Sequence, residues 1–534
     1  MKSLAQPEIM QKLHTTISNS STLTTGSNAT AVSSSPSSPS LGQMHSSYSK
    51  RRRSPTQASD SKATISLCKQ YLKENNHLGL ALIARQKGIP AFMRREVWPV
   101  LLKYHPYVIS PYLSATADSD EDTKIPEGKV RHDLMKYFRV RTNLDDVSRN
   151  KESSSGVITP PENALSAIEE EIVNILEAAI VKFFSKWGTI IKYDSGHSWI
   201  ALNLAEWFPP IPNSNYVLVG RDITNKADPT NKHLTQLAEE SDDCLDTDFS
   251  LDQTSSQSSD STSTQQMSFA EVFERLVLVL LHSHQDVDDG MSRRNSTESV
   301  KHQTITDLIS SNSLNRQELL FKSGNIETRI SYFLVVFAKL LPELYKSLSE
   351  DDIINKNSNK NNQWLTWWFK YCGAKVLSKF DRGRLWDLLL GFRYPYKVFE
   401  KRFAGEPKLL KRFKKLYDVE PEFDTPGLEI SSDTFWHSTT ENENDLQWSQ
   451  IDYQIQLAFI YVSILQKSES KLLEFDQFEI TEFLNKLPVS QKVDSEFMLQ
   501  NTDFVYNDFE RLLKDAGELW RNWLWNEIND ERND

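Results

Sequence analysis

Cysteine is scarce in this 534-residue sequence, which contains three and no C-x-x-C motif. Cys68, Cys244 and Cys372 lie far apart along the chain. This spacing argues against the disulfide framework that holds many small secreted domains together. Widely spaced, unpaired cysteines are typical of a reducing compartment. We therefore expect a cytoplasmic protein.

Long hydrophobic runs are also missing. The best apolar stretches, Leu276–Leu281 and Tyr332–Leu341, fall well short of the roughly 20 residues that a helix needs to span a bilayer. The chain begins Met1-Lys2-Ser3 and soon becomes polar, without the apolar segment of a secretory signal. The sequence therefore predicts neither a transmembrane segment nor export.

An overall excess of positive charge is absent as well, since the formal net charge is −12. Residues 1–63 carry seven basic and two acidic side chains, so this segment is positive and the remaining chain has a net charge of −17. An acidic body disfavours a nucleic-acid-binding face. We therefore expect no nucleic acid among the partners.

Motifs for cofactor or covalent chemistry are not found either. The chain has no G-x-x-x-x-G-K-[ST] loop that would cradle a nucleotide phosphate, and no Ser-His-Asp or Cys-His arrangement can be assigned from spacing. His282 and His284 precede a run of aspartates, but no further ligand cluster accompanies them. We expect no metal and no cofactor.

Hydrophobic periodicity of the helical kind is what the sequence does contain. It predicts an all-α fold, because apolar side chains recur every three to four residues in segment after segment, whereas the main strand signal is Tyr216–Val219. Pro342 should split one helix. The expected helices cover residues 64–82, 91–103, 165–187, 198–208, 268–281, 317–321, 329–348, 363–371, 382–390, 451–467, 477–486 and 503–528.

Polar segments interrupt these helices and define the predicted domain organisation. Residues 1–63 are rich in serine and threonine and should form a disordered basic tail, because they bury too little apolar surface to offset the entropy of ordering. Residues 64–534 should form one helical domain. Four polar inserts are expected within it, at about 142–163, 211–266, 286–303 and 395–448.

Two separated sequence blocks form a recognisable pattern. The first is Gly88-Ile89-Pro90 followed by Arg94 and Trp98, and the second contains Trp364–Phe369 followed by Arg382, Trp386 and Asp387. These blocks resemble those of the TBC domain, the helical domain of GTPase-activating proteins for Rab GTPases. Matching segments occur in family order between about residues 88 and 488. The inserts and the basic tail are most similar to the fungal branch called oxidant-induced cell-cycle arrest protein 5.

The resemblance implies two catalytic positions, and both depart from the family pattern. The family carries I-x-x-D-x-x-R, whose arginine acts on the nucleotide; here Val130, Asp133 and Lys136 occupy the matching places. A second family motif, Y-x-Q-G, supplies a glutamine. Here it corresponds to Tyr193-Asp194-Ser195-Gly196, so that Ser195 stands for the glutamine.

The substitutions matter because of the chemistry that the family performs. Arginine neutralises the charge on the transferred phosphoryl group through a planar fork, an effect of about 10³–10⁵ in rate. Lys136 brings charge without the fork. The glutamine orients the attacking water, and Ser195 has a much shorter side chain. The resemblance therefore implies a GTPase-binding adaptor with weak or no activating power.

Two other interpretations remain open at this point. The protein could be an active GTPase activator that uses Lys136, or Arg139 after a shift in register. Alternatively, it could be a scaffold in stress or cell-cycle signalling that binds no GTPase. An ordinary exposed i, i+3 pair would also account for Asp133 and Lys136. Trp98, Trp386 and Asp387 are interpreted as architectural, with the carboxylate capping a helix.

Two serines follow basic clusters and predict regulation by protein kinases. Ser54 follows Arg51-Arg52-Arg53 and precedes a proline, while Ser296 lies in Arg-Arg-Asn-Ser. Phosphorylation there would add roughly −1.5 to −2 charge beside arginines. We expect it to change partner choice and not the fold.

Overall fold

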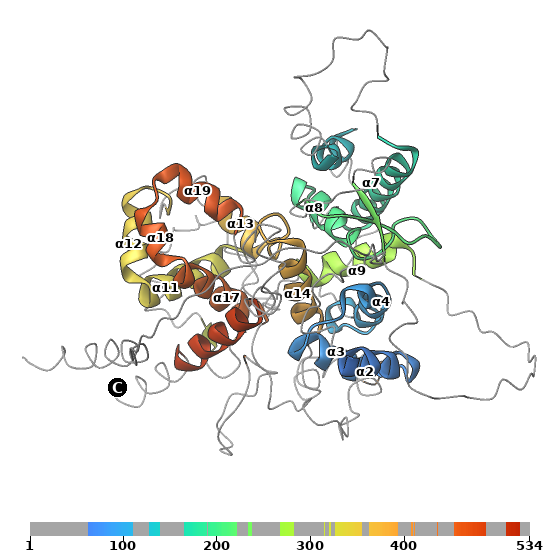
Figure 1. Ribbon diagram of the computed structural model, residues 1–534, viewed down its shortest axis with the longest axis horizontal. Helices are drawn as coiled ribbons and strands as arrows, with labels where there is room; N and C mark the ends of the chain where they lie inside the picture. Colours follow the sequence, from blue (N-terminus) through green and yellow to red (C-terminus); the bar gives the residue numbers. More distant parts are fainter. Residues whose placement is uncertain are drawn as a thin grey trace, which may run out of the picture. The chain divides into compact units, whose positions relative to one another are not determined.

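Helices dominate the regular structure of this protein, as seen in a computed structural model (Figure 1). The all-α prediction is thereby confirmed. The structure describes residues 62–109, 128–138, 165–188, 191–221, 233–237, 267–281, 314–315, 320–321, 326–354, 363–392, 407–408, 411, 435, 453–487 and 509–523. The predicted tail up to residue 61 and the inserts at 142–163 and 286–303 lie outside these ranges.

Most helices coincide with predicted segments, whereas the helices over residues 106–109, 129–138 and 469–474 were not predicted. The first group contains α2 (Lys62–Lys73), α3 (His77–Gln86), η2 (Ala91–Met93), α4 (Arg94–Lys103), α5 (Pro106–Ile109), a helix over residues 129–138, α7 (Ala167–Trp187), α8 (Ser195–Leu204) and α9 (Phe269–Leu280). The second group contains α11 (Ile326–Leu340), α12 (Pro342–Glu350), α13 (Gln363–Phe369), α14 (Lys379–Leu390), α17 (Tyr453–Lys467), α18 (Glu469–Glu474), α19 (Gln477–Asn485) and the helical residues 509–523.

Side-chain caps fix where several helices begin. Ser166 accepts a hydrogen bond from the backbone of Glu169 at the start of α7, and the Glu169 side chain bonds back to the Ser166 backbone. Ser268 and Glu271 make the same reciprocal pair at α9. Each cap satisfies backbone N–H groups that the first helical turn leaves without partners.

Two predicted helices are divided by identifiable residues. Pro342 begins α12 and ends the preceding helix, as predicted. The single helix expected over residues 64–82 is instead α2 and α3. The division arises because Asn75 adopts a positive φ of 55° and Asn76 caps α3 by accepting a hydrogen bond from Gly79.

Two short β-hairpins correct the predicted organisation. β1 (Tyr216–Leu218) pairs antiparallel with β2 (Leu234–Gln236), so the beginning of the insert expected at 211–266 is ordered. The side chains of Val217, Leu218, Val219 and Leu234 are buried there, which explains why this segment packs despite its polar flanks. The helix expected at 317–321 is also wrong, because β3 (Leu314–Asn315) pairs with β4 (Leu320–Phe321).

Helix α14 lies at the centre of the packing. It contacts α3, α4 and α9. Both its apolar and its charged side chains are buried. α7 packs along α9, and α11 packs along α17. Because α14 carries Arg382, Trp386 and Asp387, it links the second sequence block to the helices that carry the first.

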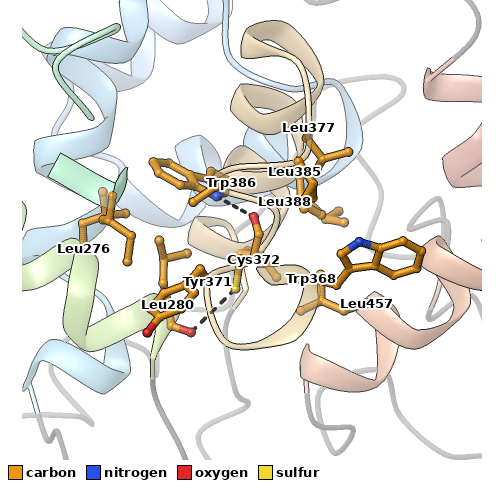
Figure 2. Close-up of a cluster of buried hydrophobic side chains, with 14 of the residues drawn as sticks. Leu276, Leu280, Trp368, Tyr371, Cys372, Leu377, Leu385, Trp386, Leu388 and Leu457 are labelled. Atoms are coloured by element: carbon orange, nitrogen blue, oxygen red, sulfur yellow. Dashed lines mark hydrogen bonds between the residues drawn. The ribbon is translucent and has the colours of Figure 1, made fainter. Parts of the chain in front are cut away.

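The turn before α14 anchors the core in its neighbourhood (Figure 2). Cys372 is fully buried, has a positive φ of 45°, and donates from Sγ to the carbonyl of Leu280 on α9. Its own carbonyl accepts a hydrogen bond of 3.1 Å from Trp386 Nε1. These bonds connect α9, the turn and α14. None of the helices in the described ranges is long and apolar enough to cross a membrane.

Candidate functional site

Asp133 is the centre of the candidate site. Its helix, residues 129–138, is held by the buried side chains of Val130, Leu134 and Tyr137. Asp133 itself is 6% exposed, whereas the Lys136 side chain, one turn later, is 52% exposed. Lys136 Nζ lies 2.7 Å from Asp133 Oδ1. The Lys136 ammonium group is therefore bound by a carboxylate of its own helix.

The second oxygen of Asp133 reaches the other predicted motif. Tyr193 donates from its hydroxyl to Asp133 Oδ2 at 2.9 Å, and the same hydroxyl lies 2.8 Å from Ser198 Oγ on α8. Burial, together with the nearby Asp133 carboxylate, raises the pKa of the Tyr193 phenol and keeps it protonated. One carboxylate thus joins two motifs that lie 60 residues apart.

Asp194 sets the beginning of α8. It accepts a hydrogen bond of 2.9 Å from the backbone of Gly196, and its Oδ2 lies 2.7 Å from Lys370 Nζ. Burial would raise the pKa of Asp194, but interactions with His197 and Lys370 outweigh it and hold this pKa well below its usual range. The cap places Ser195 at the first position of α8, where it is partly exposed.

Gly196 is required by close packing. A Cβ built on Gly196 would lie 2.2 Å from Cζ of Tyr371, a separation that packed atoms do not reach. The Tyr371 ring is buried, and burial, with Asp194 nearby, raises the pKa of its phenol. The absence of a side chain at residue 196 therefore lets α8 approach the turn after α13.

The architectural residues of the two sequence blocks meet around Asp387. Its carboxylate accepts hydrogen bonds from the backbone of Ile89 (3.0 Å), from Arg94 Nη2 (2.8 Å) and from Trp98 Nε1 (2.7 Å). The Arg94 and Asp387 side chains are both fully buried. Asp387 therefore does not cap a helix, contrary to prediction; it lies within α14 and binds the segment before α4 and α4 itself.

The other residues of these blocks also have structural partners. Gly88 has a positive φ of 77°, and a Cβ there would lie 2.7 Å from Cδ of Arg384. Pro90 precedes η2. Arg382 bonds the carboxylate of buried Glu206 and the carbonyl of Leu377. These contacts hold the helices together.

Three cationic residues beside the site were missed by the sequence analysis. Lys370 binds Asp194; Arg221 lies with its guanidinium carbon 4.6 Å from the centre of the Trp199 ring; and Lys375 Nζ lies 4.8 Å from the centre of the Trp367 ring. Arg221 falls in the predicted insert, and the lysines fall between two helices. No motif marks these positions.

Some predicted positions lie outside the described residues, namely Arg139, Ser54 and Ser296. Across the described ranges, histidine, cysteine, aspartate and glutamate side chains do not assemble in groups of three that could hold a metal ion.

Relatives of similar length align with most of this sequence. The oxidant-induced cell-cycle arrest protein 5 of Meyerozyma guilliermondii is 33% identical, over 87% of this chain and 95% of its own. The chain belongs to the oxidant-induced cell-cycle arrest protein 5 family. The family's protein from Debaryomyces hansenii is 32% identical over 87% of this chain and 80% of its own, and that of Kluyveromyces lactis is 32% identical over 87% and 93%.

Two further comparisons gave no match. No protein-family model matches this member of the oxidant-induced cell-cycle arrest protein 5 family, and no solved structure matches it. Its similarity to TBC domains therefore rests on the residues named above, and the roles that this similarity implies for Lys136 and Ser195 stay predictions.

Proposed function

We propose that this protein is a TBC-like helical adaptor that binds a Rab-type GTPase without efficiently accelerating GTP hydrolysis. The observation that carries the proposal is the 2.7 Å pair between Lys136 and Asp133. In the TBC pattern that this sequence resembles, an arginine finger corresponds to residue 136. In this chain that residue is a lysine, and its ammonium group is already bound to a carboxylate.

The chemistry of the two side chains supports weak activity. An arginine presents two parallel N–H donors to phosphoryl oxygens, whereas a lysine presents a point charge. The Lys136 ammonium is also paired with Asp133, so it could approach a phosphate only while it is shared with that largely buried carboxylate. Both effects lower the stabilisation that this position gives to the transition state.

Ser195 supports the same conclusion at the second position. A glutamine amide both donates and accepts, and its reach allows it to orient the attacking water. Ser195 is fixed at the start of α8, because Asp194 caps the helix and Gly196 packs against Tyr371. A backbone so constrained cannot move forward to compensate for the shorter side chain.

Binding is proposed because hydrogen bonds to two buried carboxylates hold the helices around Lys136 and Ser195 in place. Asp387 joins the Gly88–Trp98 segment to α14, and Asp133 joins the helix over residues 129–138 to the loop before α8. Relatives carry a name that speaks of cell-cycle arrest induced by an oxidant. We place this chain in the same response, acting through a bound GTPase and not through hydrolysis.

The test is a panel of Rab GTPases, each loaded with GTP and mixed with the full-length protein. Binding is measured first, and single-turnover GTP hydrolysis is measured on the GTPases that bind. Binding with little acceleration supports the adaptor. Strong acceleration would replace it with an active GTPase activator, and absence of binding across the panel would favour a scaffold that binds no GTPase.

A further inference from the structure

Basic residues from three separate segments gather on the face that carries Lys136. We propose that Lys136, Arg221 and Lys375 form a binding site for a phosphate group at the end of a polyphosphate chain, as in a nucleoside triphosphate. The proposal rests on the proposed function only in assigning the phosphate to a GTPase-bound nucleotide. As an anion site it stands on the geometry below.

The backbone around Arg221 is fixed beside Lys136. The N–H of Gly220 donates to the hydroxyl of Tyr137 at 3.1 Å, and Tyr137 directly follows Lys136 in its helix. Lys379 Nζ bonds the carbonyls of Leu218 and Val219, each at 3.1 Å. Hydrogen bonds with two elements thereby fix the backbone that follows β1, and with it the position of the Arg221 backbone.

Helix α8 positions Lys375 near Arg221. Asn203 donates to the carbonyl of Ala374, the residue before Lys375, at 2.5 Å. Trp199, which lies under the guanidinium of Arg221, is one helical turn before Asn203 on α8. Residues four apart share one face of a helix. Arg221 and Lys375 therefore lie along the same face of α8.

The aromatic partners orient the charges without neutralising them. The guanidinium carbon of Arg221 lies 4.6 Å from the centre of the Trp199 ring, and Lys375 Nζ lies 4.8 Å from that of Trp367. A guanidinium stacked on a ring keeps its N–H groups in the stacking plane, where they remain free to bind an anion. Both side chains are exposed.

Arg221 and Lys375 have no carboxylate partner among the residues that the structure describes. Glu206 lies within electrostatic range of Arg221, but its carboxylate is bonded by Arg382. Lys136 has Asp133, which Tyr193 shares. Partial burial, with the charges of Arg221 and Lys136, lowers the pKa of Lys375, as expected for a cation among cations. An anion with several charges would relieve this repulsion.

Phosphate fits the cluster better than a single carboxylate does. Its oxygens can accept from a planar guanidinium and from two ammonium groups at once. The rest of the chain beyond residue 63 is strongly acidic, with a net charge of −17, so a local group of three cations with one carboxylate is unlike its surroundings. Arg221 and Lys375 add positive charge beside Lys136, at a position where the TBC pattern has a single arginine.

The experiment uses the full-length protein and inorganic tripolyphosphate, titrated by calorimetry at low salt and near pH 7. The double variant Arg221→Gln, Lys375→Gln should bind at least about tenfold more weakly, since it loses two charge-assisted contacts. The matched control, Lys346→Gln with Lys471→Gln, removes the same charge from exposed positions on α12 and α18. Its affinity should stay close to that of the native protein.

The outcomes separate this site from the GTPase proposal. Equal weakening in both double variants, or no binding by the native protein, overturns the phosphate site. In a second arm, GTPases loaded with GDP and aluminium fluoride are tested for binding to the same variants. A cluster-dependent gain over GDP alone assigns the phosphate to the GTPase. Tripolyphosphate binding that depends on Arg221 and Lys375, without any GTPase binding, keeps the phosphate site and rejects the proposed function.

Discussion

The ring of Tyr371 lies directly against the backbone of Gly196, so closely that a Cβ would come within 2.2 Å of it. The two residues lie far apart in sequence, and their contact fixes the beginning of α8 against the turn that follows α13. Together with the Asp194 cap, this contact sets the position of Ser195 at the start of α8.

The change Gly196→Ala should therefore lower the free energy of unfolding by about 1–3 kcal/mol, the usual cost of forcing an extra methyl group into a packed site. Chemical denaturation measures the effect. Ser195→Ala is the matched control, because it alters the neighbouring, partly exposed position without a clash. Equal stability of the two variants would show that Tyr371 can move aside.

Loss of the Asp387 carboxylate should be more damaging. Asp387→Asn leaves the buried guanidinium of Arg94 without its counterion, and removing one partner of a buried pair costs about 3–5 kcal/mol. We expect a much lower urea midpoint or loss of soluble protein. The pair of partly exposed Arg95 with exposed Glu96 provides the comparison, since Glu96→Gln should change stability by about 0–1 kcal/mol. Similar effects from both changes would contradict the role given to Asp387.

The combined change Lys136→Arg, Ser195→Gln should give the protein GTPase-activating power on any Rab that it binds. It restores the fork and the amide at the two positions where transition-state charge and the attacking water would lie. Single-turnover hydrolysis measures the gain, and binding affinity serves as the control. Because such residues act as a unit, each single change should give far less than the pair.

Native activity that survives Lys136→Ala would disprove the assignment of residue 136. Arg139→Ala should then abolish that activity, and the activator interpretation would replace the adaptor.

Cys68 and Cys372 should react poorly with thiol reagents in the folded protein. Both side chains are fully buried, and burial raises the pKa of each thiol to about 12. The thiolate is the reactive form, so iodoacetamide near pH 8 should label neither residue until urea unfolds the chain. Peptide mass spectrometry reads each cysteine separately. Rapid labelling of either one in the native state would show that its helices open.

The same thiols predict how stability depends on pH. Their pKa values are higher in the folded than in the unfolded chain, so the unfolded chain loses these protons first as the pH rises. Their contribution to stability is complete below about pH 9 and is lost as the pH approaches about 12. Denaturation midpoints should fall as the pH is raised from about 9 to about 11. A flat profile would contradict the burial of these thiols.

Helices were the part of this structure that the sequence predicted well. Ser166, Ser268 and Pro342 each mark a helix start through local chemistry that acts within a few residues. The hairpin β1–β2 was harder to predict, because its apolar residues are few and gain stability only from pairing across a polar segment. Composition alone assigned that segment to an insert.

The site was predictable only in part, for the same physical reason. The TBC resemblance named Asp133 and Tyr193, but the hydrogen bond between them depends on how the helix over residues 129–138 packs against the loop before α8. Arg221 and Lys375 carry no motif, and their proximity to Lys136 follows from bonds made by Gly220 and Asn203. Long-range contacts of this kind have no local signature in the sequence.

The bond between Arg94 and Asp387 also has a consequence for synthesis on the ribosome. Its two residues are 293 positions apart. At roughly 5–20 residues per second, Arg94 is synthesised about 15–60 s before its counterion. Until α14 is synthesised, the first helices therefore have an unpaired guanidinium and an uncovered apolar face. A nascent chain stalled before α14 should be a substrate for chaperones, whereas one released after α14 can close around Asp387.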